Sequence, residues 1–166
     1  MIPNVTFKVE PSGDREIIMT RVFDAPADLV YEAMTKPELV QQWLLGPDGW
    51  TMPVCEIDLQ VGGAYRYVWR NEDGREMGMR GKFTELVPGK RVQHTERFDE
   101  AWYAGESLNT WVLTESGGRT TLTLTMRYET RETRDEVLDS GMESGVATSY
   151  DRLDKILAEM SAQSTK

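Results

Sequence analysis

The sequence predicts an α+β fold in which one curved antiparallel sheet wraps around a long C-terminal helix. Between residues 5 and 127, apolar and polar side chains alternate in short runs separated by turn residues, as in strands with one buried face. From residue 130 to residue 160 the apolar side chains recur every three or four positions, as in an amphipathic helix. A sheet that curves around one helix tends to leave a cavity between them, so a binding cup is the expected shape.

The first two strands, residues 5–9 and 17–23, are expected to form a hairpin because Pro11-Ser12-Gly13-Asp14 between them has turn chemistry. Two short helices follow this first long strand pair, over residues 26–34 and 37–43. Each begins at a proline, which is favoured in the first turn of a helix.

Six further strands are predicted from alternating side chains and from the glycine-containing turns between them. They cover residues 51–59, 65–70, 77–86, 91–98, 107–114 and 120–128. The last two flank Ser116-Gly117-Gly118, which is a strong hairpin signal.

The C-terminal segment is predicted to start with a short helical turn capped by Thr133. The apolar stripe of the main helix consists of Met142, Val146, Ser149, Leu153, Ile156, Leu157 and Met160. Gly141 and Gly145 each lower helix propensity by about 1 kcal/mol, so a close approach or a thin wall is expected there.

Length and charge narrow the class of protein. We expect one domain over residues 1–166 with an ordered core of about 5–160. The net charge of −9 disfavours nucleic acid and anionic lipid heads as partners. No apolar run approaches the roughly 18–20 residues of a membrane span, and the N-terminus does not read as a signal peptide. Cytoplasm is therefore the expected compartment.

Large, mostly apolar side chains are expected to point into the cavity and bind a small hydrophobic molecule. The predicted ligand-binding residues are Tyr65, Tyr67, Trp69, Met79, His94, Asn109, Trp111, Met142 and Val146, with Met77 beside them and the loop of Trp102 and Tyr103 at the mouth. The alternative is that the same rings and the methionines simply fill the core between sheet and helix.

Catalysis is the second hypothesis, and we lean towards a protein that is not an enzyme. His94 is the only histidine and shares a strand face with Glu96, so these two are the candidates for acid–base work in a cyclase or isomerase. The alternative is a histidine that is hydrogen-bonded within the wall. Asn109 would suit a ligand carbonyl or hydroxyl group.

Metal and cofactor chemistry finds no support in the sequence. One histidine and one cysteine, far apart in the chain, make no ligand cluster, so we expect no metal and no cofactor. Cys55 lies in mid-strand among apolar neighbours, where a thiol is normally inert, and no intrachain disulfide can form.

Several short segments recur in the same order in a known family. They are Ile17–Pro26 (IIMTRVFDAP), Trp43 with Gly46-Pro47, Val54-Cys55-Glu56 before Gly62-Gly63, Met79-Arg80-Gly81 and Ser140-Gly141-Met142-Glu143-Ser144-Gly145. On these motifs the chain resembles the bacterial branch of the activator of Hsp90 ATPase homologue 1-like (AHSA1-like) proteins, within the START/Bet v 1/polyketide-cyclase (SRPBCC) group. The resemblance runs from about residue 5 to residue 160. It implies the helix-grip fold, with a seven-stranded antiparallel sheet, a gripped C-terminal helix and a deep apolar pocket.

The resemblance implies an aromatic or lipid-like ligand, since the group contains lipid carriers, hormone receptors and cyclases. Val146 stands where the family pattern has an aromatic, and Leu44-Leu45 replaces a second aromatic after Trp43. Both departures should enlarge or reshape the cavity. The third hypothesis is a stress-response module that binds an Hsp90-type chaperone through its surface. We expect this role not to carry over, because the activators have a separate N-terminal domain. A monomer or a homodimer is expected.

Overall fold

The structure is a computed structural model that describes residues 7–164. Its strands are β1 (Lys8–Ser12), β2 (Glu16–Phe23), β3 (Trp50–Ile57), β4 (Ala64–Asn71), β5 (Glu76–Val87), β6 (Arg91–Phe98), β7 (Ser107–Ser116) and β8 (Arg119–Arg127). Its helices are α1 (Ala27–Thr35), α2 (Pro37–Trp43), α3 (Arg131–Asp139) and α4 (Met142–Ser164). The elements therefore follow the order that the hydrophobic periodicity predicts.

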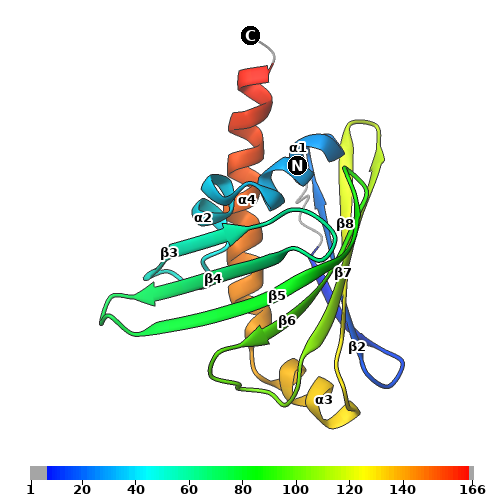
Figure 1. The fold of residues 1–166 in the computed structure, drawn as a ribbon. Helices are drawn as coiled ribbons and strands as arrows, with labels where there is room; N and C mark the ends of the chain where they lie inside the picture. Colours follow the sequence, from blue (N-terminus) through cyan, green and yellow to red (C-terminus); the bar gives the residue numbers. More distant parts are fainter. Residues whose placement is uncertain (1–6, 165–166) are drawn as a thin grey trace.

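All the strands join one antiparallel sheet in the order β1-β2-β8-β7-β6-β5-β4-β3. The chain leaves β2 near one edge of the sheet and re-enters at β3, on the opposite edge. α1 and α2 make this crossing, which places them over one end of the sheet (Figure 1). The remaining strands are joined in sequence from β3 to β8 by short connections, so the sheet curves as a continuous surface.

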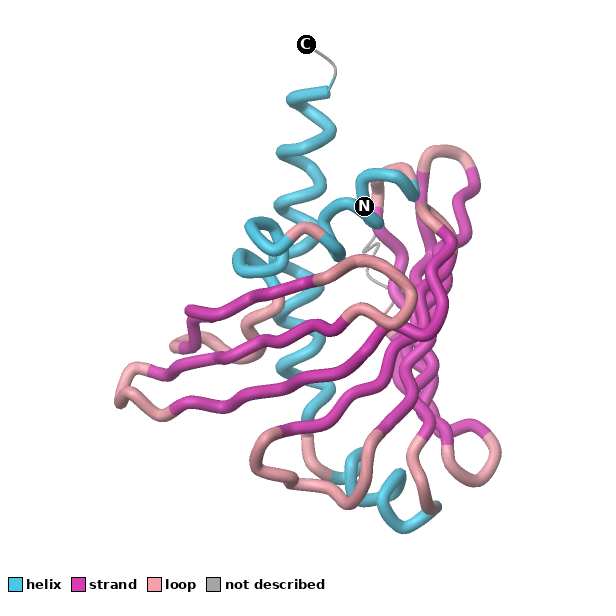
Figure 2. Tube along the Cα trace, in the orientation of Figure 1, coloured by secondary structure: helices cyan, strands magenta, loops and turns pink. Residues whose placement is uncertain are grey.

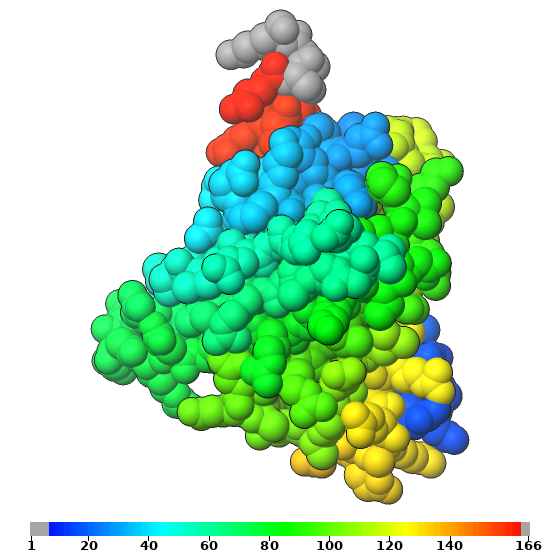
Figure 3. All heavy atoms as spheres, in the orientation of Figure 1, coloured from blue at the N-terminus to red at the C-terminus, as the bar shows by residue number. Residues whose placement is uncertain are grey.

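α4 crosses the concave face of this sheet, which confirms the helix-grip α+β prediction (Figure 2). Leu153 and Leu157 of α4 are fully buried against Phe23 and Leu122 of the sheet and against Val30 of α1. This packing forms part of the core between sheet and helix. The strands and the two short helices cover one side of the molecule, and the last turns of α4 project beyond them (Figure 3).

A buried arginine fixes α4 to the sheet. Arg21 lies on the inner face of β2 with only 2% of its surface exposed. Its guanidinium donates to Asp151 at 3.1 Å and to Asp154 at 3.4 Å, and both carboxylates are on α4. The same group lies 5.4 Å from the centre of the Phe23 ring. Because a buried cation needs a partner, this contact holds the helix at one height along the sheet.

The N-terminal hairpin differs in detail from the prediction. Pro11 and Ser12 were expected in the turn, but they pair with Ile17 and Glu16 as part of β1. The turn itself is Gly13 to Arg15, where Gly13 has the positive φ of 56° that favours glycine. β1 makes the sheet eight-stranded, one strand more than the resemblance implied. Residue 5, the predicted start of this strand, lies outside the described residues.

The short helical turn predicted before the main helix is a helix of nine residues, α3. Thr130, not Thr133, caps α3, because its hydroxyl accepts a hydrogen bond of 3.1 Å from the backbone N–H of Thr133. Gly141 has a φ of 81°, which ends the helical path before α4 begins. Its neighbourhood is open, so backbone conformation rather than close approach requires this glycine.

Candidate ligand-binding site

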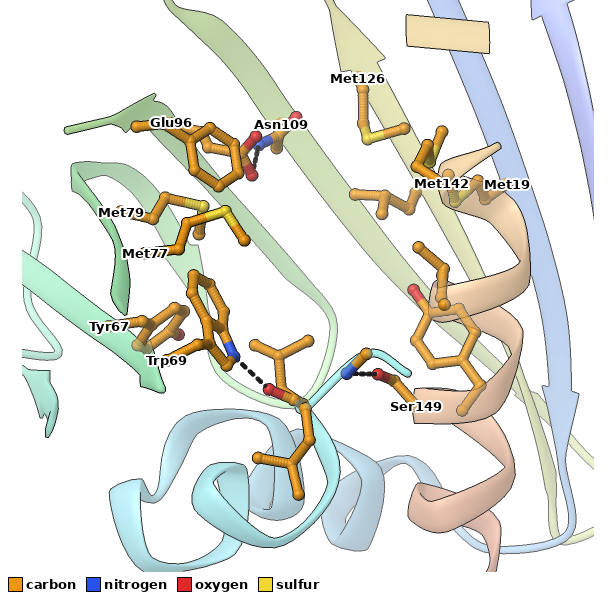
Figure 4. Close-up of a pocket in the computed structure, with 18 of the residues that line it drawn as sticks. Met19, Tyr67, Trp69, Met77, Met79, Glu96, Asn109, Met126, Met142 and Ser149 are labelled. Atoms are coloured by element: carbon orange, nitrogen blue, oxygen red, sulfur yellow. Dashed lines mark hydrogen bonds between the residues drawn. The ribbon is translucent and has the colours of Figure 1, made fainter. Parts of the chain in front are cut away.

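A cavity of about 530 Å³ lies between the sheet and α4. Its wall combines residues of the sheet, of α3 and α4, and of the loop after α2. In the close-up view, Tyr67, Trp69 and Met79 on the sheet face Met142 and Ser149 on α4 across open space (Figure 4). The curvature of the sheet thus leaves a chamber where the packing of the core stops.

Strand alternation positions the sheet side of this wall. Tyr67 and Trp69 are two residues apart on β4, so both point to the concave face. Met79 lies opposite Tyr67, and Met77 opposite Trp69, in the β4–β5 ladder. Met77 remains 38% exposed, which places it towards the opening of the chamber. These paired positions build a wall of two rings and two thioethers.

The helix side of the wall comes from the first turns of α4. Met142, Val146 and Tyr150 follow one another at four-residue spacing and line the cavity. Gly145 lies beside them, and a Cβ at this position would approach Pro47 to 3.3 Å. Gly145 therefore permits the close approach that its place in a helix predicts, between α4 and the loop after α2.

That loop, residues 44–47, is tied to both sides of the cavity. Trp69 donates through its indole nitrogen to the carbonyl of Leu44 at 2.7 Å. The backbone N–H of Gly46 donates to the hydroxyl of Ser149 at 2.9 Å, and Arg152 donates to the carbonyl of Gly46 at 2.8 Å. The first two of these bonds are visible in Figure 4. The loop thus bridges β4 and α4 and forms one end of the chamber.

A polar cluster centred on Glu96 interrupts the apolar wall. One carboxylate oxygen accepts a hydrogen bond of 3.0 Å from the hydroxyl of Tyr103, and the other accepts one of 3.2 Å from the amide of Asn109. The hydroxyls of Tyr103 and Ser107 lie 3.2 Å apart. Burial raises the pKa of Glu96, while the hydrogen bonds from Tyr103, Asn109 and Ser107 oppose that rise.

His94 lines the cavity but belongs to a separate hydrogen-bond group. Its Nδ1 lies 3.1 Å from the hydroxyl of Tyr65 and 3.1 Å from the carbonyl of Thr95. Tyr65 donates its own proton to the Thr95 carbonyl at 2.6 Å. Burial lowers the pKa of His94 to about 4, so the ring is neutral at pH 7. No hydrogen bond between His94 and Glu96 occurs within residues 7–164.

The structure places all the predicted ligand-binding residues on the cavity wall except Tyr65. The residues that line it are Tyr67, Trp69, Met79, His94, Asn109, Trp111, Met142 and Val146. Tyr65 lies behind them with Phe83 at a small separate void of about 30 Å³. Gly81 permits this, because a side chain there would collide with the Tyr65 ring.

The two aromatic residues of the loop that was expected at the mouth of the cavity, Trp102 and Tyr103, lie in different places. Trp102 lines the cavity and is 44% exposed, whereas Tyr103 is buried and contacts Glu96 from behind. Leu44, Leu45 and Val146, the positions that depart from the family pattern, all line the cavity.

Other lining residues were missing from the prediction. Met19, Tyr128, Ser149 and Tyr150 also line the cavity. Met19 lies on the inner face of β2 by strand parity, and Ser149 belongs to the predicted helix stripe, so a signal existed for both. Tyr128 follows the last residue of β8, but it ends the strand predicted over residues 120–128 and has the parity of Leu124 and Met126, so a signal existed for it too.

The Cys55 thiol is poorly suited to nucleophilic chemistry. Burial, with smaller effects of Glu38 and Glu56, raises the pKa of the Cys55 thiol to about 12, so the thiolate is scarce at neutral pH. Within the described residues, no three His, Cys, Asp or Glu side chains come together as a metal site.

None of the described helices has the length and apolarity needed to span a membrane.

Comparisons with known proteins agree with this architecture. The model of the family described as activator of Hsp90 ATPase homolog 1-like protein matches residues 24–158. A solved structure from Rhodobacter sphaeroides is 32% identical, with a TM-score of 0.87, over 93% of this chain and 99% of that chain. One from Chromobacterium violaceum is 28% identical, with a TM-score of 0.75, over 86% of this chain and 96% of that chain.

A more distant structure shares the fold alone. DynU16, a protein of the dynemicin biosynthetic locus, is 23% identical with a TM-score of 0.65. The similarity covers 88% of this chain but 48% of that one. No curated protein matches the chain.

Proposed function

Because the chain belongs to the activator of Hsp90 ATPase homologue 1-like family, we propose that it binds one small, largely hydrophobic molecule between the sheet and α4. Proteins of this fold group are generally ligand-binding or polyketide-cyclase-like. The proposed contacts are the lining residues described above, with Glu96 and Asn109 as the polar groups.

The observation that carries this proposal is the cavity itself. Its volume of about 530 Å³ falls within the range of roughly 300–1,000 Å³ typical of small-molecule sites. Such sites combine a mainly apolar wall with a few placed polar groups. Here rings and methionines supply the wall, and Glu96 with its two donors supplies the polar point.

Native mass spectrometry of protein purified from its own host tests the proposal. The expected result is a bound species of small-molecule mass that gentle activation releases. Thermal-shift measurements with hydrophobic compounds complement it, since a ligand present at 100 times its Kd stabilises the folded state by about 2.7 kcal/mol. Bare protein in the first experiment, together with no stabilisation across a chemically broad set of compounds, would contradict the proposal.

One observation favours a second candidate, a cyclase or isomerase that moves a proton. Glu96 is a carboxyl group with a raised pKa on the wall of an apolar cavity, as expected for a general acid or base. A bound ketone such as 2-tetralone should then exchange its α-hydrogens in D₂O faster with the protein than without it. The exchange should disappear in Glu96→Gln, and equal rates with wild type and this variant would exclude the enzyme.

The family name also suggests a protein partner, an Hsp90-type chaperone. Such a role would depend on the outer surface and would be unaffected by a side chain that fills the cavity. We also propose a cytoplasmic location, because a chain with a single cysteine has no intrachain disulfide that a reducing compartment would break.

A further inference from the structure

We infer that the ligand is a hydrophobic amine, bound as its ammonium form with the charged group against the carboxylate of Glu96. This inference rests on the proposed function, because it names the chemical class of the molecule that the same cavity holds. It depends on three features of the wall: its charge, the free acceptor capacity of Glu96, and the rings beside that carboxylate.

The charged groups of the wall have one sign only. Glu96 is the only acidic residue among the described residues that line the cavity, and none of them is lysine or arginine. His94, the remaining basic group, is neutral at pH 7 because burial holds the pKa of its ring near 4. The carboxylate of a fatty acid or a phosphate group would therefore face Glu96 without a compensating cation. An anionic ligand is disfavoured.

The hydrogen bonds of Glu96 leave room for a further donor. Tyr103 donates to one oxygen of the carboxylate and Asn109 to the other, and Ser107 also interacts with the group, whereas the two oxygens together can accept about four hydrogen bonds. All three present partners are neutral. A buried carboxylate is costly without a cationic partner, and removing that cost is a source of binding free energy. A ligand ammonium group supplies both the charge and the donors.

Aromatic rings surround the same end of the cavity. Phe98 lies two residues after Glu96 on β6 and packs at 5.8 Å from Trp102 and 5.9 Å from Tyr103. The Tyr103 ring in turn packs at 5.3 Å from that of Tyr128. Phe98, Trp102 and Tyr128 line the cavity together with Glu96. Aromatic faces attract cations, so a carboxylate within such a cluster favours an ammonium group over a neutral one.

Isothermal titration calorimetry with three matched probes tests the inference at pH 7. The probes are 9-(aminomethyl)anthracene, 9-anthracenemethanol and anthracene-9-carboxylic acid, which share one ring system and differ in the charge of the head group. Wild-type protein should bind the amine about tenfold or more tightly than the alcohol, and the acid most weakly, as expected for a charge-assisted hydrogen bond.

Two variants locate the source of this preference. Glu96→Gln should reduce the affinity for the amine to about that of the alcohol, so that the difference between these two probes disappears. Glu100→Gln removes the same charge four residues further on, from an exposed side chain outside the cavity wall, and should keep the wild-type order. It controls for general attraction of cations by the net charge of −9.

Each outcome decides between the two claims. Equal affinity of wild-type protein for amine and alcohol, or a preference that survives Glu96→Gln, would overturn the amine inference and leave the hydrophobic site standing. Absence of binding by all three probes would overturn both. If Glu96→Gln does not fold, as judged by circular dichroism, the order of the three probes on wild type and on Glu100→Gln decides the matter.

Discussion

Asn109 donates its side-chain amide to Glu96 at 3.2 Å across the β6–β7 ladder. In the register of these strands Asn109 lies directly opposite His94, whereas Glu96 is paired with Ser107. The amide thus reaches diagonally past its own cross-strand partner. Glu96 and His94, which could have formed an acid–base pair, therefore have different partners. Glu96 accepts from Asn109, and His94 contacts Tyr65.

Removal of that donor should destabilise the protein at neutral pH. Asn109→Leu removes a buried amide and leaves the half-buried carboxylate of Glu96 with one fewer partner, so we expect the free energy of unfolding to fall by about 1–3 kcal/mol at pH 7. Urea denaturation measures this. In a Glu96→Gln background the same substitution should cost clearly less, because the two side chains act together. Equal costs in both backgrounds would show that the hydrogen bond contributes nothing.

The raised pKa of Glu96 predicts how stability changes with pH. Between the unfolded pKa of about 4.3 and the higher folded value, the folded state holds a proton that the unfolded state has lost. The unfolding free energy of wild type should therefore decrease relative to Glu96→Gln as the pH rises through this window. Urea denaturation of both proteins at several pH values above 4 tests the sign. If the unfolding free energy of wild type instead rose relative to that of Glu96→Gln as the pH increased, the folded pKa of Glu96 would be lowered rather than raised.

His94 should act in the opposite direction at acidic pH. Its folded pKa of about 4 lies below the unfolded value of about 6.5, so the unfolded state takes up a proton first as the pH falls between these values. Wild type should lose on the order of 2–3 kcal/mol across this window relative to His94→Gln. As His94 is the only histidine, its ring proton signal in NMR reports the midpoint directly. A midpoint near 6.5 would contradict the buried, neutral ring.

Filling the cavity should weaken binding without unfolding the protein. Val146→Trp places an indole where Val146 lines the chamber, so the affinity for 9-anthracenemethanol should fall by about tenfold or more. Val61→Trp makes the same change at a side chain that is 66% exposed and outside the wall, and should leave the affinity unchanged. Fluorescence titration of the probe measures both. Undiminished binding by Val146→Trp would place the ligand elsewhere.

Periodicity was sufficient to predict the order of elements and the inner face of most strands, whereas β3 changes parity at a register shift between Thr51 and Val54. Tyr67, Trp69 and Trp111 line the cavity because alternate residues share a face, which sequence shows directly. Tyr65 has the same parity but lies deeper, since Gly81 on the neighbouring strand leaves room for its ring. Alternation predicts the face of a side chain but not its depth.

Contacts between distant segments could not be predicted in this way. The hydrogen bonds of Glu96 depend on the register of β6 against β7 and on the path of the loop that carries Tyr103. Arg21 pairs with Asp151 and Asp154, and this pairing depends on how α4 lies on the sheet. Neither arrangement follows from hydrophobic patterning, because the groups involved are polar.

The methionine methyl groups give the most direct test of ligand binding in the cavity. Those that line it are Met19, Met34, Met77, Met79, Met126 and Met142, whereas Met52 and Met160 lie outside the wall. In protein labelled with ¹³C at the methionine methyls, titration with 9-anthracenemethanol should shift the signals of the lining group and leave Met52 and Met160 in place. Shifts confined to Met52 and Met160, or no shifts at saturating probe, would contradict a binding chamber between the sheet and α4.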